Sequence, residues 1–195
     1  MRQTYGDSIR VYIEIGRRRT FAGAIDWPGW CRIGDDEVSA LDALFTIWPR
    51  YAAVLQAAQI EFTPPTGPGS LIVVEELEGN ATTDFGAPNI SPQNDNRQVT
   101  EDDFLRLQSL VMACWQALDA AVIMAADHEL KKGPRGGGRD LISILQHLVS
   151  SDASDLARLA CNYKIRDIKN PMEELGRMRQ ATLDALARAA LEGIP

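Results

Sequence analysis

The chain has 195 residues, of which 45% are hydrophobic and 24% charged, a composition that supplies a folded core and excludes wholesale disorder. Its 20 lysines and arginines against 27 aspartates and glutamates give a net charge of -7, which opposes binding to the phosphates of a nucleic acid. The length fits either one domain of ordinary size or two small units.

The N-terminal residues and the cysteines indicate where the protein resides. Residues 1–7 lead into no apolar stretch of the kind found in a secretory signal, and no apolar run approaches the roughly 20 residues of a bilayer span. We therefore expect a cytoplasmic protein without a membrane partner. Cys31, Cys114 and Cys161 are far apart and odd in number, which favours reduced thiols. The sequence has no Cys-x-x-Cys pair, which excludes a zinc ribbon.

The start of the chain predicts a β-hairpin. Apolar side chains at every second position predict a strand over residues 10–15, and a second strand over 20–25 pairs back on it. Gly16 and three arginines make the turn between them. Pro28 then ends the ladder because proline has no amide donor.

A helix interrupted by proline follows the hairpin. Asp35 or Asp36 caps it, and its apolar side chains recur on one face. These side chains are Leu41, Leu44, Phe45 and Trp48. Pro49 kinks or splits the helix, and a second helical piece continues over residues 50–58.

The predicted N-terminal part is a β-β-α-β unit over residues 1–78. Its last strand begins at Glu61 and Phe62, is interrupted by prolines and glycines, and resumes as a β-branched run over residues 71–77. Residues 79–99 are rich in Asn, Pro, Gly and Asp, and we interpret them as a connector between two parts of the chain.

Three amphipathic helices are predicted over residues 100–195. The first is capped by Thr100, and apolar residues then keep a three-four spacing as far as Val122. The second runs over residues 140–149, and the third starts at Asn170 with a proline behind it. The predicted fold class is α+β, in which the small β-β-α-β unit precedes an antiparallel helical bundle.

Residues 21–41, with the sequence FAGAIDWPGWCRIGDDEVSAL, resemble the HicB-like module. The shared features are a strand that leads into a Pro-Gly turn, then Gly-Asp, then an acidic-capped helix with an Ala-Leu pair. HicB proteins are antitoxins that usually carry a DNA-binding element after this module, but no helix-turn-helix or ribbon element is recognisable here. The resemblance implies an interaction module with a small basic protein as its partner.

Residues 104–191 resemble a DinB-like bundle, on the order of their helices and on the sequence LQHLV at 145–149. That family includes metal-dependent thiol transferases and hydrolases that carry a histidine triad on facing helices. The resemblance places the first metal-binding histidine of the family at His147. The later His-x-x-x-His pair is absent, and the other histidine, His128, lies upstream, so a three-histidine site is impossible.

A divalent ion could still be held by His147 together with carboxylates such as Asp152 or Glu173. Zinc, manganese, iron and nickel accept such mixed nitrogen and oxygen ligands. At about 100° per residue, however, His147 falls off the apolar stripe of its helix, whereas Asp152 falls near the centre of that stripe. The alternative interpretation of His147 is a solvent-facing or boundary residue.

Asp152 raises a question of its own, because an ionised carboxylate on an apolar helix face needs a cation, hydrogen-bond donors or water. Arg139 and His128 are candidate partners. Alternatively, the helix breaks at Ser150 and Ser151, and Asp152 caps the next helix.

Two further groups of residues are candidate ligand sites. Arg135 and Arg139 lie in a glycine-rich loop at a helix start, which could seat a phosphate or carboxylate or could be a plain interhelical turn. Trp27 and Trp30 could line a ligand cleft or could close a small core.

Three functional hypotheses follow. The first is a DinB-like protein whose metal site has degenerated and which binds a small molecule or a protein, including a second copy of itself. The second is a metal- or thiol-dependent transferase that uses His147. The third is a HicB-like antitoxin or interaction module.

Overall fold

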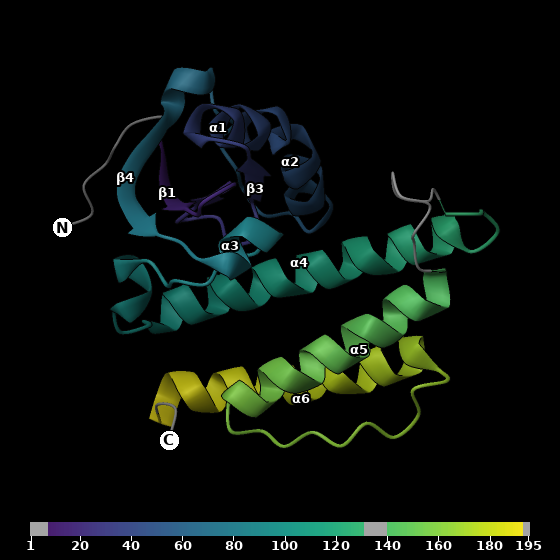
Figure 1. Cartoon of the computed structure of the whole chain (residues 1–195). Coiled ribbons are helices and arrows are strands. Elements are labelled where there is room, and N and C mark those ends of the chain that lie inside the picture. Colours follow the sequence, from purple (N-terminus) through teal and green to yellow (C-terminus); the bar gives the residue numbers. More distant parts are fainter. Residues whose placement is uncertain (1–7, 131–139, 193–195) are drawn as a thin grey trace. The chain divides into compact units, whose positions relative to one another are not determined.

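The chain forms two compact units, Met1–Gln98 and Val99–Pro195, here called the N-terminal unit and the helical unit. The structure, a computed structural model, describes residues 8–130 and 140–192 (Figure 1). The N-terminal unit contains a four-stranded mixed sheet, and the helical unit contains long helices. The fold class is therefore α+β, as the sequence predicts.

The sheet has the strand order β3-β2-β1-β4. The predicted hairpin is formed by β1 (Ile9–Ile15) and β2 (Thr20–Ala24), and β4 (Leu71–Glu78) pairs with β1 in parallel. β3 (Cys31–Gly34) pairs antiparallel with β2. The sequence prediction lacks β3, because four residues between a Pro-Gly turn and a helix cap are too few to show a clear period.

Pro49 splits the helical segment as predicted. The two pieces are α1 (Glu37–Thr46) and α2 (Trp48–Ala57), with Pro49 in the first turn of α2. At the start of α1, the Asp36 carboxylate accepts a hydrogen bond from the Ser39 amide at 2.8 Å, and the Ser39 hydroxyl accepts one from the Asp36 amide at 3.0 Å. This reciprocal capping fixes the first turn of α1.

The core of the N-terminal unit combines β1 with α1 and α2. Val11, Ile13, Leu44 and Leu55 are almost completely buried, and so is Trp30, whose indole N–H donates to the Leu44 carbonyl at 2.9 Å. The hydrophobic effect of this burial is the main stabilising term of the unit.

The strand predicted at Glu61 and Phe62 is not formed. The Phe62 ring instead packs edge-on against the rings of Trp27, Trp30 and Tyr51. Prolines at positions 64 and 65 remove the amide donors that a strand would need.

The predicted connector covers residues 79–99, and all of it except Val99 lies within the N-terminal unit. They contain α3 (Ala81–Phe85) and a 3-10 turn, η2 (Gln93–Asn96), while another 3-10 turn, η1 (Pro68–Ser70), precedes β4. The hydroxyl of Thr83 on α3 donates to the buried carboxylate of Glu14 on β1. This segment is therefore anchored to the sheet.

The helical unit consists of α4 (Glu101–Ala125), α5 (Leu141–Arg158) and α6 (Pro171–Glu192) in its described part. α4 begins at the predicted cap, where the side chains of Thr100 and Asp103 each accept a hydrogen bond from the other residue's amide. α5 and α6 share an apolar core, which comprises Leu145, Val149, Leu156, Leu175, Met178 and Ala185.

α5 runs well beyond its predicted end. The Ser150 hydroxyl donates to the Gln146 carbonyl at 3.0 Å, and the Ser154 hydroxyl donates to the Ser150 carbonyl at 3.0 Å. Such bonds to the preceding turn let serine remain inside a helix. The interpretation in which the helix breaks at Ser150 and Asp152 caps a new helix is therefore wrong.

α5 and α6 run in the same direction, which corrects the antiparallel arrangement predicted for this pair (Figure 1). Near the start of α5, the Gln146 side chain donates to the carbonyl of Ile168, just before α6, at 3.2 Å. The connection between the helices, residues 159–170, is here called the crossover. It can span about 40 Å when extended, whereas α5 is about 27 Å long, so the chain returns along the helix before starting α6.

By length and composition alone, α4 is the one described helix that could cross a membrane. Its most apolar window has a mean hydropathy of 1.4. The core helix of a soluble protein passes the same test, so this is weak evidence for a membrane span.

Replacing Gly34 by alanine should destabilise the N-terminal unit, because a Cβ there would collide with the backbone of Ala40 and lie 2.5 Å from the Ser39 hydroxyl. We expect a loss of about 1–3 kcal/mol in the free energy of unfolding, measured by urea denaturation. Gly69→Ala is the matched control, because nothing lies within 4 Å of its added Cβ. Equal stability of the two variants would contradict this account of how α1 approaches β3.

Candidate functional site

A mixed polar cluster joins the three helices of the helical unit. Arg179 on α6 forms two hydrogen bonds with Asp119 on α4, at 2.7 Å from Nη1 to Oδ2 and 2.6 Å from Nη2 to Oδ1. The guanidinium carbon lies 5.5 Å from the ring centre of Trp115, within the range of a cation–π contact. Asp152 on α5 is close enough to interact electrostatically with Arg179. We call Trp115, Asp119, Asp152 and Arg179 the Arg179 cluster.

The two carboxylates of the Arg179 cluster have different environments. The hydrogen bonds from Arg179 lower the pKa of Asp119, so this carboxylate is firmly ionised. Burial and the nearby Asp155 raise the pKa of Asp152, while the charge of Arg179 acts against them. Among the described residues, Asp152 accepts no hydrogen bond and forms no ion pair. Within the described part of the chain, Asp152 is therefore the carboxylate of the cluster that has no donor.

The metal ligands suggested by the sequence do not come together on α5. His147 is exposed and Asp152 is half-buried, and five residues along a helix separate them by about 140°. Within residues 8–130 and 140–192, no group of three or more His, Cys, Asp and Glu side chains is arranged to hold a metal ion. His128 is exposed, and Arg139, the other predicted partner of Asp152, lies outside the described residues. Among the described residues, the cation whose charge acts on Asp152 is Arg179, which the sequence did not predict.

Two arginines of the glycine-rich loop and two tryptophans are the other residues that the sequence suggests as ligand contacts. Arg135 and Arg139 lie outside the described residues. Trp30 is 1% exposed and stacks on Tyr51 with ring centres 5.8 Å apart, whereas Trp27 is half-buried and meets Phe62 edge-on at 4.9 Å. These rings form an aromatic cluster that closes the core of the N-terminal unit.

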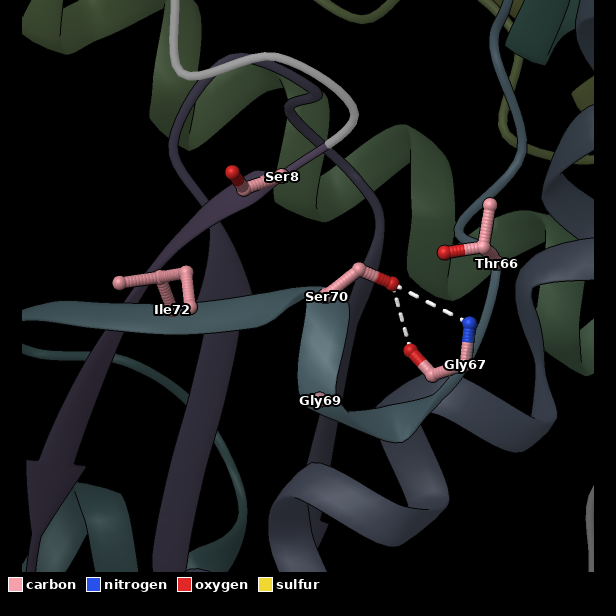
Figure 2. Close-up of a pocket in the computed structure, with 6 residues that line it drawn as sticks. All are labelled: Ser8, Thr66, Gly67, Gly69, Ser70 and Ile72. Atoms are coloured by element: carbon pink, nitrogen blue, oxygen red, sulfur yellow. Dashed lines mark hydrogen bonds between the residues drawn. The ribbon is translucent and has the colours of Figure 1, made fainter.

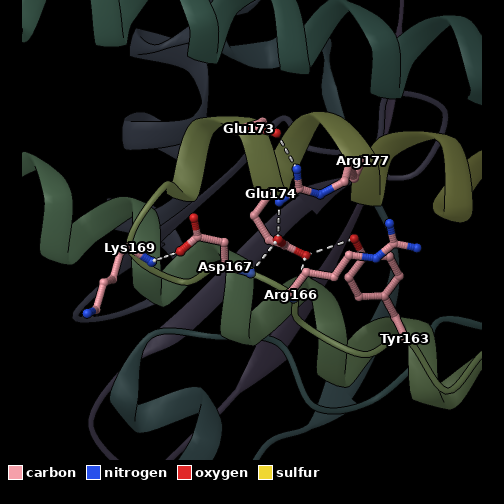
Figure 3. A network of polar contacts seen from close by, with 7 residues as sticks. All are labelled: Tyr163, Arg166, Asp167, Lys169, Glu173, Glu174 and Arg177. Carbon is pink, nitrogen blue, oxygen red and sulfur yellow. Dashed lines mark hydrogen bonds and ion pairs between the residues drawn. The ribbon is translucent and has the colours of Figure 1, made fainter.

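A second polar network is centred on Glu174, which is completely buried in the first turn of α6 (Figure 3). Its carboxylate accepts hydrogen bonds from the Tyr163 hydroxyl at 2.8 Å, the Arg166 amide at 3.1 Å and the Asp167 amide at 2.9 Å. Arg177 forms an ion pair with it from the next turn of the helix. Three of these donors belong to the crossover, so Glu174 fixes the crossover against α6.

Sequence reasoning missed Glu174, although a signal for it exists. Glu174 lies one turn before Met178 and two turns before Thr182, on the apolar stripe of α6. A carboxylate on such a stripe needs donors, for the same reason that Asp152 does. The donors themselves could not be read from the sequence, because two of them are backbone amides of an irregular segment.

A shallow hollow of about 370 Å³ lies beside η1 and the start of β4 and is lined partly by Thr66, Gly67 and Ser70 (Figure 2). The Ser70 hydroxyl donates to the Gly67 carbonyl at 2.5 Å and accepts from the Gly67 amide at 3.3 Å. The hydroxyl thus holds the turn in place. None of the described residues that line the hollow has a titratable side chain. It is a weaker candidate for chemistry than the Arg179 cluster.

Comparison of the chain with family models, curated proteins and solved structures gives no match. The functional argument therefore depends on the geometry of the chain itself.

Replacing Glu174 by glutamine should loosen the crossover and destabilise the helical unit. Burial alone would raise the pKa of Glu174, but hydrogen bonds from Arg177, from the amides of Asp167 and Arg166 and from Tyr163 outweigh it and lower the pKa to about 2. Loss of this network should cost about 2–4 kcal/mol at pH 7, measured by urea denaturation.

The effect should depend on pH with a defined sign. Because its pKa is lowered on folding, Glu174 stabilises the folded state above its ordinary pKa of 4.5, and this contribution fades as the pH falls towards 2. The difference between wild type and Glu174→Gln should therefore shrink over that interval. Glu173→Gln is the control, since Glu173 bonds to the same Arg177 but is 67% exposed. This substitution should lower the free energy of unfolding by less than about 1 kcal/mol. A larger loss from Glu173 than from Glu174 would refute this assignment.

Proposed function

We propose that the helical unit is a ligand-binding module related to DinB-like bundles, in which the Arg179 cluster takes the place of a metal centre. The observation that supports this most is the position of Arg179, which bonds to Asp119 on α4 while its charge acts on Asp152 on α5. A guanidinium carries a permanent positive charge and five N–H donors, so one arginine can serve carboxylates from two helices.

Asp152 is the group that we expect to contact the ligand. Arg179 bonds to Asp119 through both terminal nitrogens, and its charge acts on Asp152 although the two side chains form no hydrogen bond. A half-buried carboxylate that lacks a hydrogen-bond donor is stabilised when a positively charged donor binds to it. The cluster also has two carboxylates for one guanidinium. A small molecule with an ammonium group is therefore the best chemical match.

The competing hypothesis is a metal-dependent transferase that uses His147, and the metal content of the protein separates the two. Protein purified without a histidine tag should contain far less than one equivalent of zinc, manganese, iron or nickel by mass spectrometry. The physical reason is that exposed His147 and half-buried Asp152 diverge on α5. One equivalent of metal in the wild type that disappears in His147→Ala would overturn the proposal in favour of the transferase.

Small amines should raise the thermal stability of the wild-type protein and not of Asp152→Asn. We would use ethanolamine, putrescine and spermidine as probes, at constant ionic strength, and measure the melting temperature. A ligand that binds only the folded protein at ten times its dissociation constant adds about 1.4 kcal/mol of stability.

Asp155→Asn is the matched control for this experiment, because Asp155 lies three residues further on α5 and its side chain is 70% exposed. It should keep most of the amine effect, because it removes a neighbouring charge but leaves the Asp152 carboxylate in place. If none of the three amines stabilises the wild type, or if both variants lose the effect equally, Asp152 is not the ligand contact.

A further inference from the structure

One face of the sheet in the N-terminal unit carries an alternating set of polar and aromatic side chains. Tyr12 and Glu14 are two residues apart on β1 and therefore point to the same face. A shift in register between Val11 and Tyr12 pairs Tyr12 with Glu75 on β4. Without this bulge Glu75 would pair with Ile13 and belong to the opposite, apolar face. The bulge thus places Glu75 beside Tyr12.

Residues 86–97, here called the strap, are bound to this face at two points. At the first, the buried Glu14 carboxylate accepts hydrogen bonds from the amides of Asn89 and Ile90, each at 2.9 Å, in addition to the Thr83 hydroxyl. At the second, the sole donor to the Glu75 carboxylate from the described residues is the amide of Gln93, at 3.0 and 3.1 Å to its two oxygens. The strap therefore runs from above β1 to above β4.

The two attachment points differ in strength. Glu14 is 0% exposed and makes three sets of hydrogen bonds, so water cannot easily compete for it. Glu75 is half-buried and its bond to Gln93 is solvent-accessible, so water can replace that bond at little cost. The attachment at Glu75 must open more readily than the attachment at Glu14.

We propose that the strap is a lid hinged at Glu14 and latched at Glu75, which opens at the latch and uncovers Tyr12. The Tyr12 ring lies against Gly23, where an added Cβ would be 2.6 Å from the ring, and its centre is 6.0 Å from that of Phe21. Opening therefore exposes an aromatic floor on a rigid pair of strands. The device belongs to the N-terminal unit and is independent of the Arg179 cluster.

Charges at the latch bias it towards opening near neutral pH. Asp95 on the strap interacts electrostatically with Glu75 on β4 and with Tyr12 on β1, and Arg97 is the opposing positive charge. Tyr12 also interacts with Cys31 on β3 and with Glu14 on its own strand. Burial and the charge of Glu75 raise the pKa of Asp95, and Arg97 lowers it. Protonating Asp95 removes the repulsion from Glu75, so the latch should tighten as the pH falls.

Hydrogen exchange and hydroxyl-radical footprinting of the whole chain at pH 7 test the lid. In Glu75→Ala, which removes the acceptor of the Gln93 amide altogether, the amides of residues 91–98 should exchange at least about tenfold faster than in the wild type, and Tyr12 should be labelled faster. The backbone of residues 9–24 should keep its protection. Asp95→Asn, which removes the repulsion without removing the Gln93 bond, should slow exchange of the same residues 91–98.

Glu76→Ala is the matched control, because Glu76 is the exposed neighbour of Glu75 that pairs with Ile13 on the other face of the sheet. It should leave both readouts unchanged. Two results would overturn the proposal. One is unchanged exchange of residues 91–98 in Glu75→Ala, and the other is an equal rise in residues 9–24, which would mean that the strap and sheet open as one.

Discussion

Two completely buried glutamates, one in each unit, hold the irregular segments of this protein in place. Glu14 accepts the consecutive amides of Asn89 and Ile90, and Glu174 accepts the consecutive amides of Arg166 and Asp167. Each also accepts a hydroxyl, from Thr83 and Tyr163 respectively. Segments without helix or sheet leave backbone amides unpaired, and burying such amides is costly. A carboxylate with two oxygens and several lone pairs satisfies them at one point, which no apolar side chain can do.

The two glutamates differ in how their charge is balanced. Glu174 has Arg177 as an ion-pair partner, which offsets part of the cost of burying its charge. Among the described residues that bond to it, Glu14 has only neutral donors, a hydroxyl and backbone amides. Its stabilisation thus depends on the geometry of the strap itself. The parallel course of α5 and α6 depends in turn on Glu174, because the crossover must be held along the pair for α6 to start beside the start of α5.

Local patterns in the sequence predicted the elements whose partners are near in the chain. The alternation around Val11 predicted the hairpin, Pro49 predicted the division between α1 and α2, and Thr100 predicted the start of α4. Interactions between residues far apart in the chain could not be predicted in this way. The hydropathy pattern placed Asp152 on the apolar side of its helix, but its neighbour Arg179 lies on another helix, which helical periodicity cannot reveal. The predicted direction of α6 was wrong for the same reason. A loop that reverses the chain and a crossover that runs back along the helix have similar compositions.

A guanidinium and a metal ion place different demands on the carboxylates around them. A divalent ion has positions to fill in a fixed geometry and can exchange a ligand for water or substrate, whereas arginine keeps its charge at any physiological pH and reaches only as far as its side chain allows. Arg179 satisfies Asp119 with two short bonds and leaves Asp152 with attraction but no bond. If the cluster served stability alone, Asp152 would cost less as an apolar residue, because the stripe around it is apolar and burial disfavours its charge. The lack of a donor for Asp152 among the described residues is therefore the observation on which the proposed amine ligand depends.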